Sequence, residues 1–325
     1  MDKINLANLP TKIIKLEKLS KKYNKNIYLK RDDFTGTETS GNKVRKLEYS
    51  IKEALNNKCN CVITVGALQS NHCRATAAVC AKLGLECHLI LKGNIEEFEG
   101  NLFLDYILGA KVHLVNEDSS LDEEMDKIAE ELTKKGRTVY KIPVGASNKI
   151  GTYGYINTYN EILEQEKNLN IKFDLISIPV GSGGTYAGLW YGNYNTNNNK
   201  RILGFSVNSS KEEFKEKIVD ILNTIDNKIN SFDTIDINDL YVGEGYAIAT
   251  REELEFYYKI ASTEGIVFDP CYTGKAFRGL IKEIEKGNIK EDNILFIHTG
   301  GLMGWTKEQR NIIYEIAKER KNNEI

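Results

Sequence analysis

Three cationic residues, Lys43, Arg45 and Lys46, stand at the start of a segment whose apolar residues recur at helical spacing. A polar, glycine-rich stretch precedes them, so we expect a helix to begin near Asn42. Cations are disfavoured at a helix N-terminus, where the macrodipole is positive, and such exceptions often mark functional sites. The dipole and the neighbouring charges should also lower the pKa of Lys43. The pattern makes Lys43 a candidate amine nucleophile, with a solvated helix face as the alternative.

A glycine-rich turn forms a second candidate site, between an expected strand at residues 173–180 and an expected helix. Its residues are Gly181, Ser182, Gly183, Gly184 and Thr185. Main-chain N–H groups at such a turn bind phosphate, assisted by the helix dipole. Tyr186 stands where a Walker A loop needs Gly-Lys and where the dinucleotide fingerprint needs Gly or Ala, so neither nucleotide motif matches. The turn predicts a site for the phosphate of a small cofactor, and a purely structural turn is the alternative.

Small polar side chains follow the expected strand at residues 61–65. Ser70, Asn71 and His72 stand there, just before an expected helix. Groups at the carboxyl end of a parallel strand, beside a helix N-terminus, are well placed to bind a carboxylate. Ser and Asn are also common helix caps, so capping is the alternative for Ser70 and Asn71.

Short apolar runs alternate with helical patterns along nearly the whole chain. The expected strands cover residues 61–65, 86–91, 111–115, 138–142, 173–180, 202–207 and 293–298. Each is followed by a glycine or polar loop and then by helical periodicity, which is typical of βα units. The fold class we expect is therefore α/β, with parallel-rich sheets covered by helices. A basic run at residues 12–25 alternates with apolar residues and indicates a solvated helix face.

Composition narrows the class of protein further. The chain has 325 residues, enough for two domains, and a formal net charge of -2, which argues against a nucleic-acid partner. We see no apolar segment long enough to span a bilayer and no signal peptide, so we expect no membrane association and a cytoplasmic location. The six cysteines form no Cys-x-x-Cys pair and the four histidines are scattered, so neither a metal site nor a disulfide framework is indicated.

Five motifs, in order, resemble those of one pyridoxal-phosphate family, the D-cysteine desulfhydrases and aminocyclopropane-carboxylate deaminases. They are residues 40–48 (SGNKVRKLE), 69–72 (QSNH), 181–185 (GSGGT), 243–246 (GEGY) and 269–275 (DPCYTGK). The resemblance implies a fold-type II enzyme, similar to the tryptophan synthase β-subunit. Residues 1–46 and 151–325 would form a large cofactor-binding domain, and residues 47–150 a smaller inserted domain. It also implies pyridoxal 5'-phosphate as cofactor, a small amino-acid substrate and a homodimer.

The resemblance implies which residues bind the cofactor. Lys43 is similar to the lysine that binds it covalently, and Asn71 to the residue that bonds its pyridine 3-hydroxyl. The turn at residues 181–185 would hold the phosphate, with help from Lys46.

Substrate contacts follow from the same resemblance. Ser70, Asn71 and His72 would bind the substrate carboxylate, and the freed lysine or a polarised hydroxyl, for which we name Ser70, would remove the Cα proton. Tyr246 and Tyr272 would face the substrate from the opposite side, where either is placed to protonate a leaving thiolate.

Thr273 and His72 favour sulfur as the leaving group. The deaminases resemble Tyr-Glu-Gly-Lys and Ser-Asn-Gln at these two places, whereas the desulfhydrases resemble Tyr-Thr-Gly-Lys and Ser-Asn-His, as here. A hydroxyl beside the pyridine nitrogen makes a weaker electron sink, which suffices when a good leaving group sits on Cβ. The sequence predicts conversion of D-cysteine to pyruvate, sulfide and ammonia. The alternatives are aminocyclopropane-carboxylate deamination, elimination from L-cysteine, cysteate or β-chloroalanine, and a non-enzymatic two-domain solute-binding protein.

Overall fold

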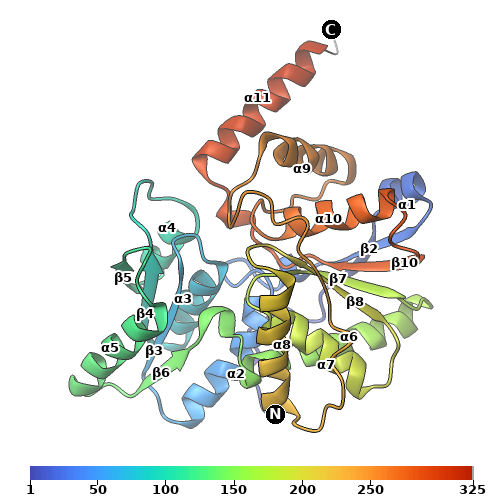
Figure 1. Cartoon of the computed structure of the whole chain (residues 1–325). Coiled ribbons are helices and arrows are strands. Elements are labelled where there is room, and N and C mark those ends of the chain that lie inside the picture. Colours follow the sequence, from blue (N-terminus) through green and yellow to red (C-terminus); the bar gives the residue numbers. More distant parts are fainter. Residues whose placement is uncertain (324–325) are drawn as a thin grey trace.

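Two β-sheets organise the chain in the computed structural model, which describes residues 1–323 (Figure 1). The strands are β1 (Ile13–Lys15), β2 (Asn26–Lys30), β3 (Cys61–Ala67), β4 (Glu86–Lys92), β5 (Lys111–Val115), β6 (Val139–Ile142), β7 (Leu175–Val180), β8 (Arg201–Ser206), β9 (Asp236–Asn238) and β10 (Asn293–Ile297). The α-helices are α1 (Glu17–Tyr23), α2 (Lys43–Asn56), α3 (Asn71–Leu83), α4 (Gly100–Ile107), α5 (Leu121–Lys134), α6 (Lys149–Leu169), α7 (Gly184–Asn195), α8 (Lys211–Ile225), α9 (Arg251–Glu264), α10 (Thr273–Glu285) and α11 (Lys307–Asn323). Three short 3-10 helices complete the description, η1 (Asp32–Phe34), η2 (Val144–Ala146) and η3 (Leu302–Gly304).

Both sheets are built mainly from parallel strands. The larger sheet has the strand order β1-β2-β10-β7-β8-β9, and the smaller has the order β5-β4-β3-β6. Strands β1 and β2 pair antiparallel, whereas the other paired neighbours run parallel. The predicted α/β fold with two parallel-rich sheets is confirmed. The domain boundaries, between residues 46 and 47 and between residues 150 and 151, remain a prediction.

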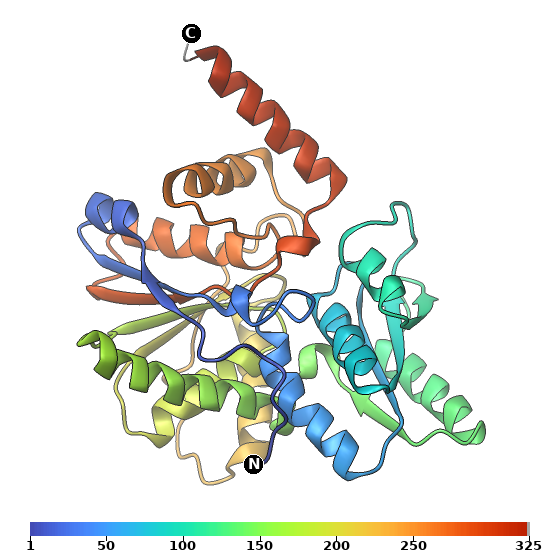
Figure 2. The ribbon, with the colours of Figure 1, turned by 180° about the vertical axis from the view of Figure 1, so that it is seen from behind.

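Helices cover both faces of the larger sheet (Figures 1 and 2). On one face α6, α7 and α8 contribute Tyr159, Leu189 and Phe214 to a buried cluster. On the other face α1 and α10 contribute Leu19 and Phe277. Strands β7 and β10 lie between these clusters, and this burial on both faces is why they read as nearly continuous apolar runs.

The seven strands expected from the sequence are all present, with small shifts at their ends, whereas β1, β2 and β9 are additional. The prediction of one helical face over residues 12–25 is wrong for its first part, which forms β1 before α1 begins. Strand β1 is three residues long, too short to show a periodicity of its own. Its conformation depends on pairing with β2, where Ile14 lies opposite Leu29.

The helix that we expected near Asn42 is α2, and it begins at Lys43. Its first turn lies against α6 at Gly154, where a Cβ would approach the carbonyl oxygen of Arg45 to 2.5 Å. The Arg45 guanidinium donates hydrogen bonds to Asp32 at 2.8 Å and to Glu161 at 2.9 Å. Close helix packing and two buried ion pairs therefore hold the turn that carries Lys43.

Candidate active site

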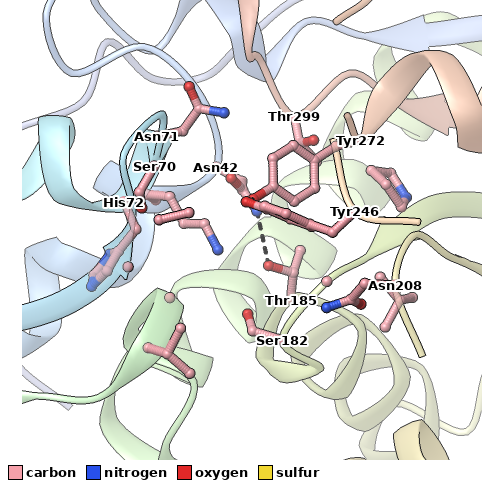
Figure 3. A pocket seen from close by; sticks show the side chains of 18 of the residues that line it. Asn42, Ser70, Asn71, His72, Ser182, Thr185, Asn208, Tyr246, Tyr272 and Thr299 are labelled. Atoms are coloured by element: carbon pink, nitrogen blue, oxygen red, sulfur yellow. Dashed lines mark hydrogen bonds between the residues drawn. The ribbon is translucent and has the colours of Figure 1, made fainter. Parts of the chain in front are cut away.

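A cavity of about 580 Å³ lies between the two sheets (Figure 3). Its wall includes Ala67 and Lys92 at the ends of β3 and β4, and Val180 at the end of β7. Asn208 and Thr299, which follow β8 and β10, complete the same edge. The carboxyl ends of strands from both sheets thus converge on one cavity, which is where α/β proteins bind ligands.

Most of the residues predicted from the sequence line this cavity. They are Lys43, Ser70, Asn71, His72, Gly181, Ser182, Gly183, Thr185, Tyr246 and Tyr272. Lys46, Gly184 and Thr273 are not among the lining residues. Asn42, Asn208 and Thr299 also line the cavity and were not predicted as site residues. Asn208 and Thr299 each stand two residues after the end of a strand, at the edge that carries the glycine-rich turn, and this position was the available signal.

Lys43 differs from its cationic neighbours because its side chain has no hydrogen bond or ion pair within the described residues. No hydrogen bond of its Nζ exists within residues 1–323, whereas Arg45 is ion-paired and Lys46 donates to the Gly145 carbonyl at 2.6 Å and to Ser147 Oγ at 2.8 Å. Burial lowers the pKa of Lys43 to about 8. The expected direction of this shift agrees with the structure, but burial is the main cause, in place of the helix dipole and neighbouring charges.

The glycine-rich turn is packed too closely for side chains. A Cβ at Gly184 would lie 2.8 Å from Lys46 Nζ, and a Cβ at Gly181 would lie 3.0 Å from the Tyr272 ring. Gly183 has a φ of +83° and precedes α7 directly. These positions therefore favour glycine, and the first turn of α7 has main-chain N–H groups without partners inside the helix.

This turn suits a phosphate electrostatically. Burial and then the charge of Lys43 lower the pKa of Lys46 well below its usual value, so an anion beside them would relieve an unfavourable arrangement. Hydroxyls add further donors, since Ser182 accepts from Ser147 at 2.8 Å and Thr185 accepts from the Asn42 amide at 3.0 Å. Each of these accepting hydroxyls keeps its own hydrogen to donate.

The N-terminus of α3 forms the opposite wall. Ser70 caps this helix, because its Oγ accepts from the Cys73 N–H at 3.2 Å, and it also lines the cavity. The Thr64 hydroxyl donates to the Ile142 carbonyl at 2.8 Å, so its 2.9 Å contact with His72 requires Nε2–H of His72 as donor. Burial lowers the pKa of His72 well below its usual value, which leaves the ring neutral. Its ring N–H is therefore used by Thr64 and is not free for a carboxylate.

Tyr246 and Tyr272 form a pair on the far side of the cavity (Figure 3). Their rings are 5.8 Å apart at 77°, and their hydroxyls are hydrogen-bonded to each other. Burial raises the pKa of both phenols above the usual value, so both keep their protons at neutral pH. Lys275 Nζ donates to the main chain at Val242 and Gly245, at 2.6 and 2.5 Å, and thereby tethers the segment that carries Tyr246.

Thr273 and Thr299 are both candidates for the hydroxyl beside the pyridine nitrogen of the cofactor. The Thr273 hydroxyl donates to Asp269 Oδ1 at 2.5 Å and accepts from the Asp269 N–H at 2.9 Å. Thr299 lines the cavity, and its hydroxyl has no hydrogen-bond partner within the described part of the chain. Of these two threonines, Thr299 is therefore the one whose hydroxyl is available at the cavity wall within residues 1–323.

A family model described as pyridoxal-phosphate dependent enzyme matches residues 4–300. The chain belongs to this family, and pyridoxal phosphate is its cofactor. It is 42% identical to a bifunctional D-cysteine desulfhydrase/1-aminocyclopropane-1-carboxylate deaminase of Arabidopsis thaliana, over 92% of this chain and 78% of that protein. It is 41% identical to a putative 1-aminocyclopropane-1-carboxylate deaminase of Thermotoga maritima, covering 96% and 100% of the two chains. A D-cysteine desulfhydrase of Salmonella newport is 35% identical, over 92% and 94%.

A solved structure of an ACC deaminase homologue has the same fold, with a TM-score of 0.89 and 37% identity over 97% of this chain and 96% of the other. The chain is thus a fold-type II enzyme that carries out pyridoxal-phosphate-dependent elimination or deamination. The interpretation as a solute-binding protein is wrong. The particular substrate is a separate question, because these relatives carry two activities in their names.

Within residues 1–323 no group of three or more His, Cys, Asp and Glu side chains is arranged to hold a metal ion. The six cysteines are free and buried. None of the described helices has the length and apolar character needed to cross a membrane.

We expect attachment of pyridoxal phosphate to the apo-protein to accelerate as the pH rises through about 8. An aldehyde reacts with the unprotonated amine, and burial lowers the pKa of Lys43 to about 8 from 10.5, so the reactive fraction should increase up to that pH and then level off. The rate is read from the visible absorbance after mixing, with Nα-acetyl-lysine as the control amine. A rate that still rises at about pH 10, as for an ordinary lysine, would contradict the shift.

Proposed function

We propose that the protein is a D-cysteine desulfhydrase, which converts D-cysteine to pyruvate, sulfide and ammonia. The observation that carries this proposal is the hydrogen-bonded pair of tyrosine hydroxyls at the cavity wall. Expulsion of a thiolate from Cβ is favoured by a proton donor near the sulfur, and a tyrosine hydroxyl at the cavity wall is such a donor. The relatives named D-cysteine desulfhydrase support the same substrate.

Lys43 is proposed to hold the cofactor covalently and then to move the Cα proton. Pyridoxal phosphate supplies the electron sink that makes this proton acidic. A lysine with a pKa of about 8 is partly unprotonated near neutral pH, so it is suited to accept and return a proton. Ser70, whose Oγ already accepts a hydrogen bond from the main chain, keeps its hydroxyl hydrogen for the substrate or for Lys43.

The other contacts divide between cofactor and substrate. Residues 181–185 and Lys46 are proposed to bind the phosphate, and Asn71 the pyridine 3-oxygen. The substrate carboxylate is proposed to lie at the N-terminus of α3, where main-chain N–H groups and Ser70 are available. His72 contributes its main-chain N–H there, because its ring N–H is bonded to Thr64.

The test is an assay of the purified enzyme with D-cysteine, measuring sulfide and pyruvate together. We expect equal amounts of the two products, and none from a Lys43→Met variant. Parallel assays with L-cysteine, cysteate and aminocyclopropane carboxylate identify the alternatives. If the enzyme converts aminocyclopropane carboxylate to 2-ketobutyrate but does not act on D-cysteine, the proposal is wrong. The deaminase activity, which is also found among the relatives' names, then takes its place.

Thr299 and Thr273 are distinguished by a matched pair of valine variants. We propose that a threonine hydroxyl faces the pyridine nitrogen, and the free hydroxyl at the cavity wall favours Thr299. Thr299→Val should weaken turnover about tenfold with little change in stability, because it removes one hydrogen bond to the cofactor. Thr273→Val should mainly destabilise the fold, by about 1–3 kcal/mol, because it leaves Asp269 with fewer partners. Thermal melts and kcat values of both variants check this. The reverse pattern would show that Thr273, and not Thr299, faces the pyridine nitrogen.

We also propose the homodimer and the domain boundaries given above. Light scattering should give a mass of about twice 36.8 kDa. A mass equal to that of one chain would remove the dimer from the proposal.

A further inference from the structure

A chain of buried hydrogen bonds leads from the protein interior to Asn71. Arg74 on α3 and Asn101 on α4 are 1% and 0% exposed. Arg74 Nε donates to the side chain of Asn101 at 2.9 Å. Because a guanidinium has no acceptor, the Asn101 atom in this contact must be the carbonyl oxygen Oδ1. The orientation of the Asn101 amide is therefore determined by Arg74.

The orientation of Asn101 determines that of Asn71 in turn. Asn101 Nδ2 donates to the Gln69 carbonyl at 2.9 Å and to Asn71 at 3.0 Å. An amide nitrogen only donates, so the Asn71 atom in this contact must be Oδ1. Asn71 lines the cavity, and no hydrogen bond of its Nδ2 exists within residues 1–323. The amide of Asn71 thus presents an N–H donor to the cavity (Figure 3).

The same chain is anchored at the segment that precedes Lys43. The two terminal nitrogens of Arg74 donate to the main-chain carbonyls of Glu38 and Ser40, the latter at 2.9 Å. The Asn101 N–H donates to Gln69 Oε1 at 2.8 Å, which joins the start of α4 to the segment before Asn71. The three side-chain nitrogens of Arg74 and both nitrogens of Asn101 each have a fixed acceptor, so this part of the buried network specifies one arrangement.

We propose that Asn101 is a positioning residue, which keeps the Asn71 amide turned so that its N–H donates to the 3-oxygen of the cofactor ring. This inference rests on the proposed contact between Asn71 and that oxygen. Asn101 itself is separated from the cavity by Asn71 and acts through it.

The key variant is Asn101→Asp, which keeps the shape of the side chain but removes its donor. Aspartate still accepts from Arg74, but it cannot donate to Asn71. Asn71 then forms its best hydrogen bond by rotating its amide, which places Oδ1 in the cavity against the 3-oxygen. Two acceptors then face each other, and the pH midpoint of the visible absorption of the bound cofactor should rise by about one unit. The affinity for pyridoxal phosphate should fall about tenfold.

Backgrounds and controls separate positioning from loss of structure. In an Asn71→Ala background no amide is left to rotate, so Asn101→Asp should add no further shift of the midpoint. Asn101→Ser removes the bonds to Asn71 without adding charge, and it should shift the midpoint in the same direction by a smaller amount. Serine also provides a second test if the aspartate variant does not fold, which a thermal melt of the apo-protein reveals.

The possible results have distinct meanings. If Asn71→Ala leaves the midpoint and the cofactor affinity unchanged, the proposed role of Asn71 fails. If Asn71→Ala shifts both but the Asn101 variants shift neither, the inference about Asn101 is overturned while the proposed function stands. Equal shifts from the Asn101 variants in both backgrounds would also overturn it, because they would show an effect that does not pass through Asn71.

Discussion

Replacing Lys43 with methionine is expected to lower turnover by at least about 10⁴-fold, the largest effect in this chain. The substitution removes the amine that is proposed to hold the cofactor and to move the Cα proton, while a side chain of similar length remains. Sodium borohydride should fix the cofactor to a peptide containing Lys43 in the wild type and leave it unattached in the variant. Pyruvate formation and mass spectrometry of the reduced protein measure both effects.

Loss of activity in this variant should not come from unfolding. The pKa of Lys43 is about 8 in the folded apo-protein and 10.5 as a free side chain, so the fold disfavours its charge. This cost is fully present below pH 8 and disappears as the pH rises from there through 10.5. Lys43→Met should therefore stabilise the apo-protein at pH 7 by about 2 kcal/mol, after allowance for solvent screening, and by less at higher pH.

Lys52→Ala is the matched control, because Lys52 lies on the same helix α2 and is not among the cavity-lining residues. We expect it to keep turnover and borohydride fixation near wild-type levels. If the cofactor is instead fixed to another lysine when Lys43 is present, the assignment of Lys43 is wrong.

Replacing Tyr272 with phenylalanine is expected to have the second largest effect, a loss of about 10²- to 10³-fold in turnover of D-cysteine. Burial raises the pKa of Tyr272 well above its usual value, so it holds its proton at neutral pH. Tyr246 is 37% exposed, and its phenol is bonded to that of Tyr272. We therefore expect Tyr246→Phe to cost less, because Tyr246 is the more exposed residue of the two.

The identity of the leaving group tests whether Tyr272 acts as a proton donor. A thiolate leaves more easily when it is protonated, whereas chloride leaves without a proton. Tyr272→Phe should therefore reduce turnover of β-chloro-D-alanine by less than about tenfold while it reduces turnover of D-cysteine far more. Equal losses with both substrates would show that Tyr272 orients or packs against the substrate and is not the donor to sulfur. Initial rates of pyruvate formation with each substrate give the comparison.

Local patterns in the sequence were sufficient for much of the fold. Strands β7 and β10 are almost entirely apolar because both faces of the sheet are covered, and they were predicted nearly to the residue. Strand β1 was missed because three residues carry no period, and its pairing with β2 is a property of the folded chain. The turn at residues 181–185 could also be predicted as a phosphate site, because a run of glycines between a strand and a helix is a pattern of neighbouring residues.

The ordered motifs of the sequence by themselves determined the family, the cofactor and most of the candidate residues that line the cavity. The tertiary structure alone decided how those side chains are used, because this depends on neighbours far away in the chain. Burial, more than the helix dipole, lowers the pKa of Lys43. Thr64 accepts the ring N–H of His72, and Asp269 accepts the hydroxyl hydrogen of Thr273. Hydrogen bonds and burial depend on which groups meet in space, and a sequence motif records which residues are present but not which partners they find.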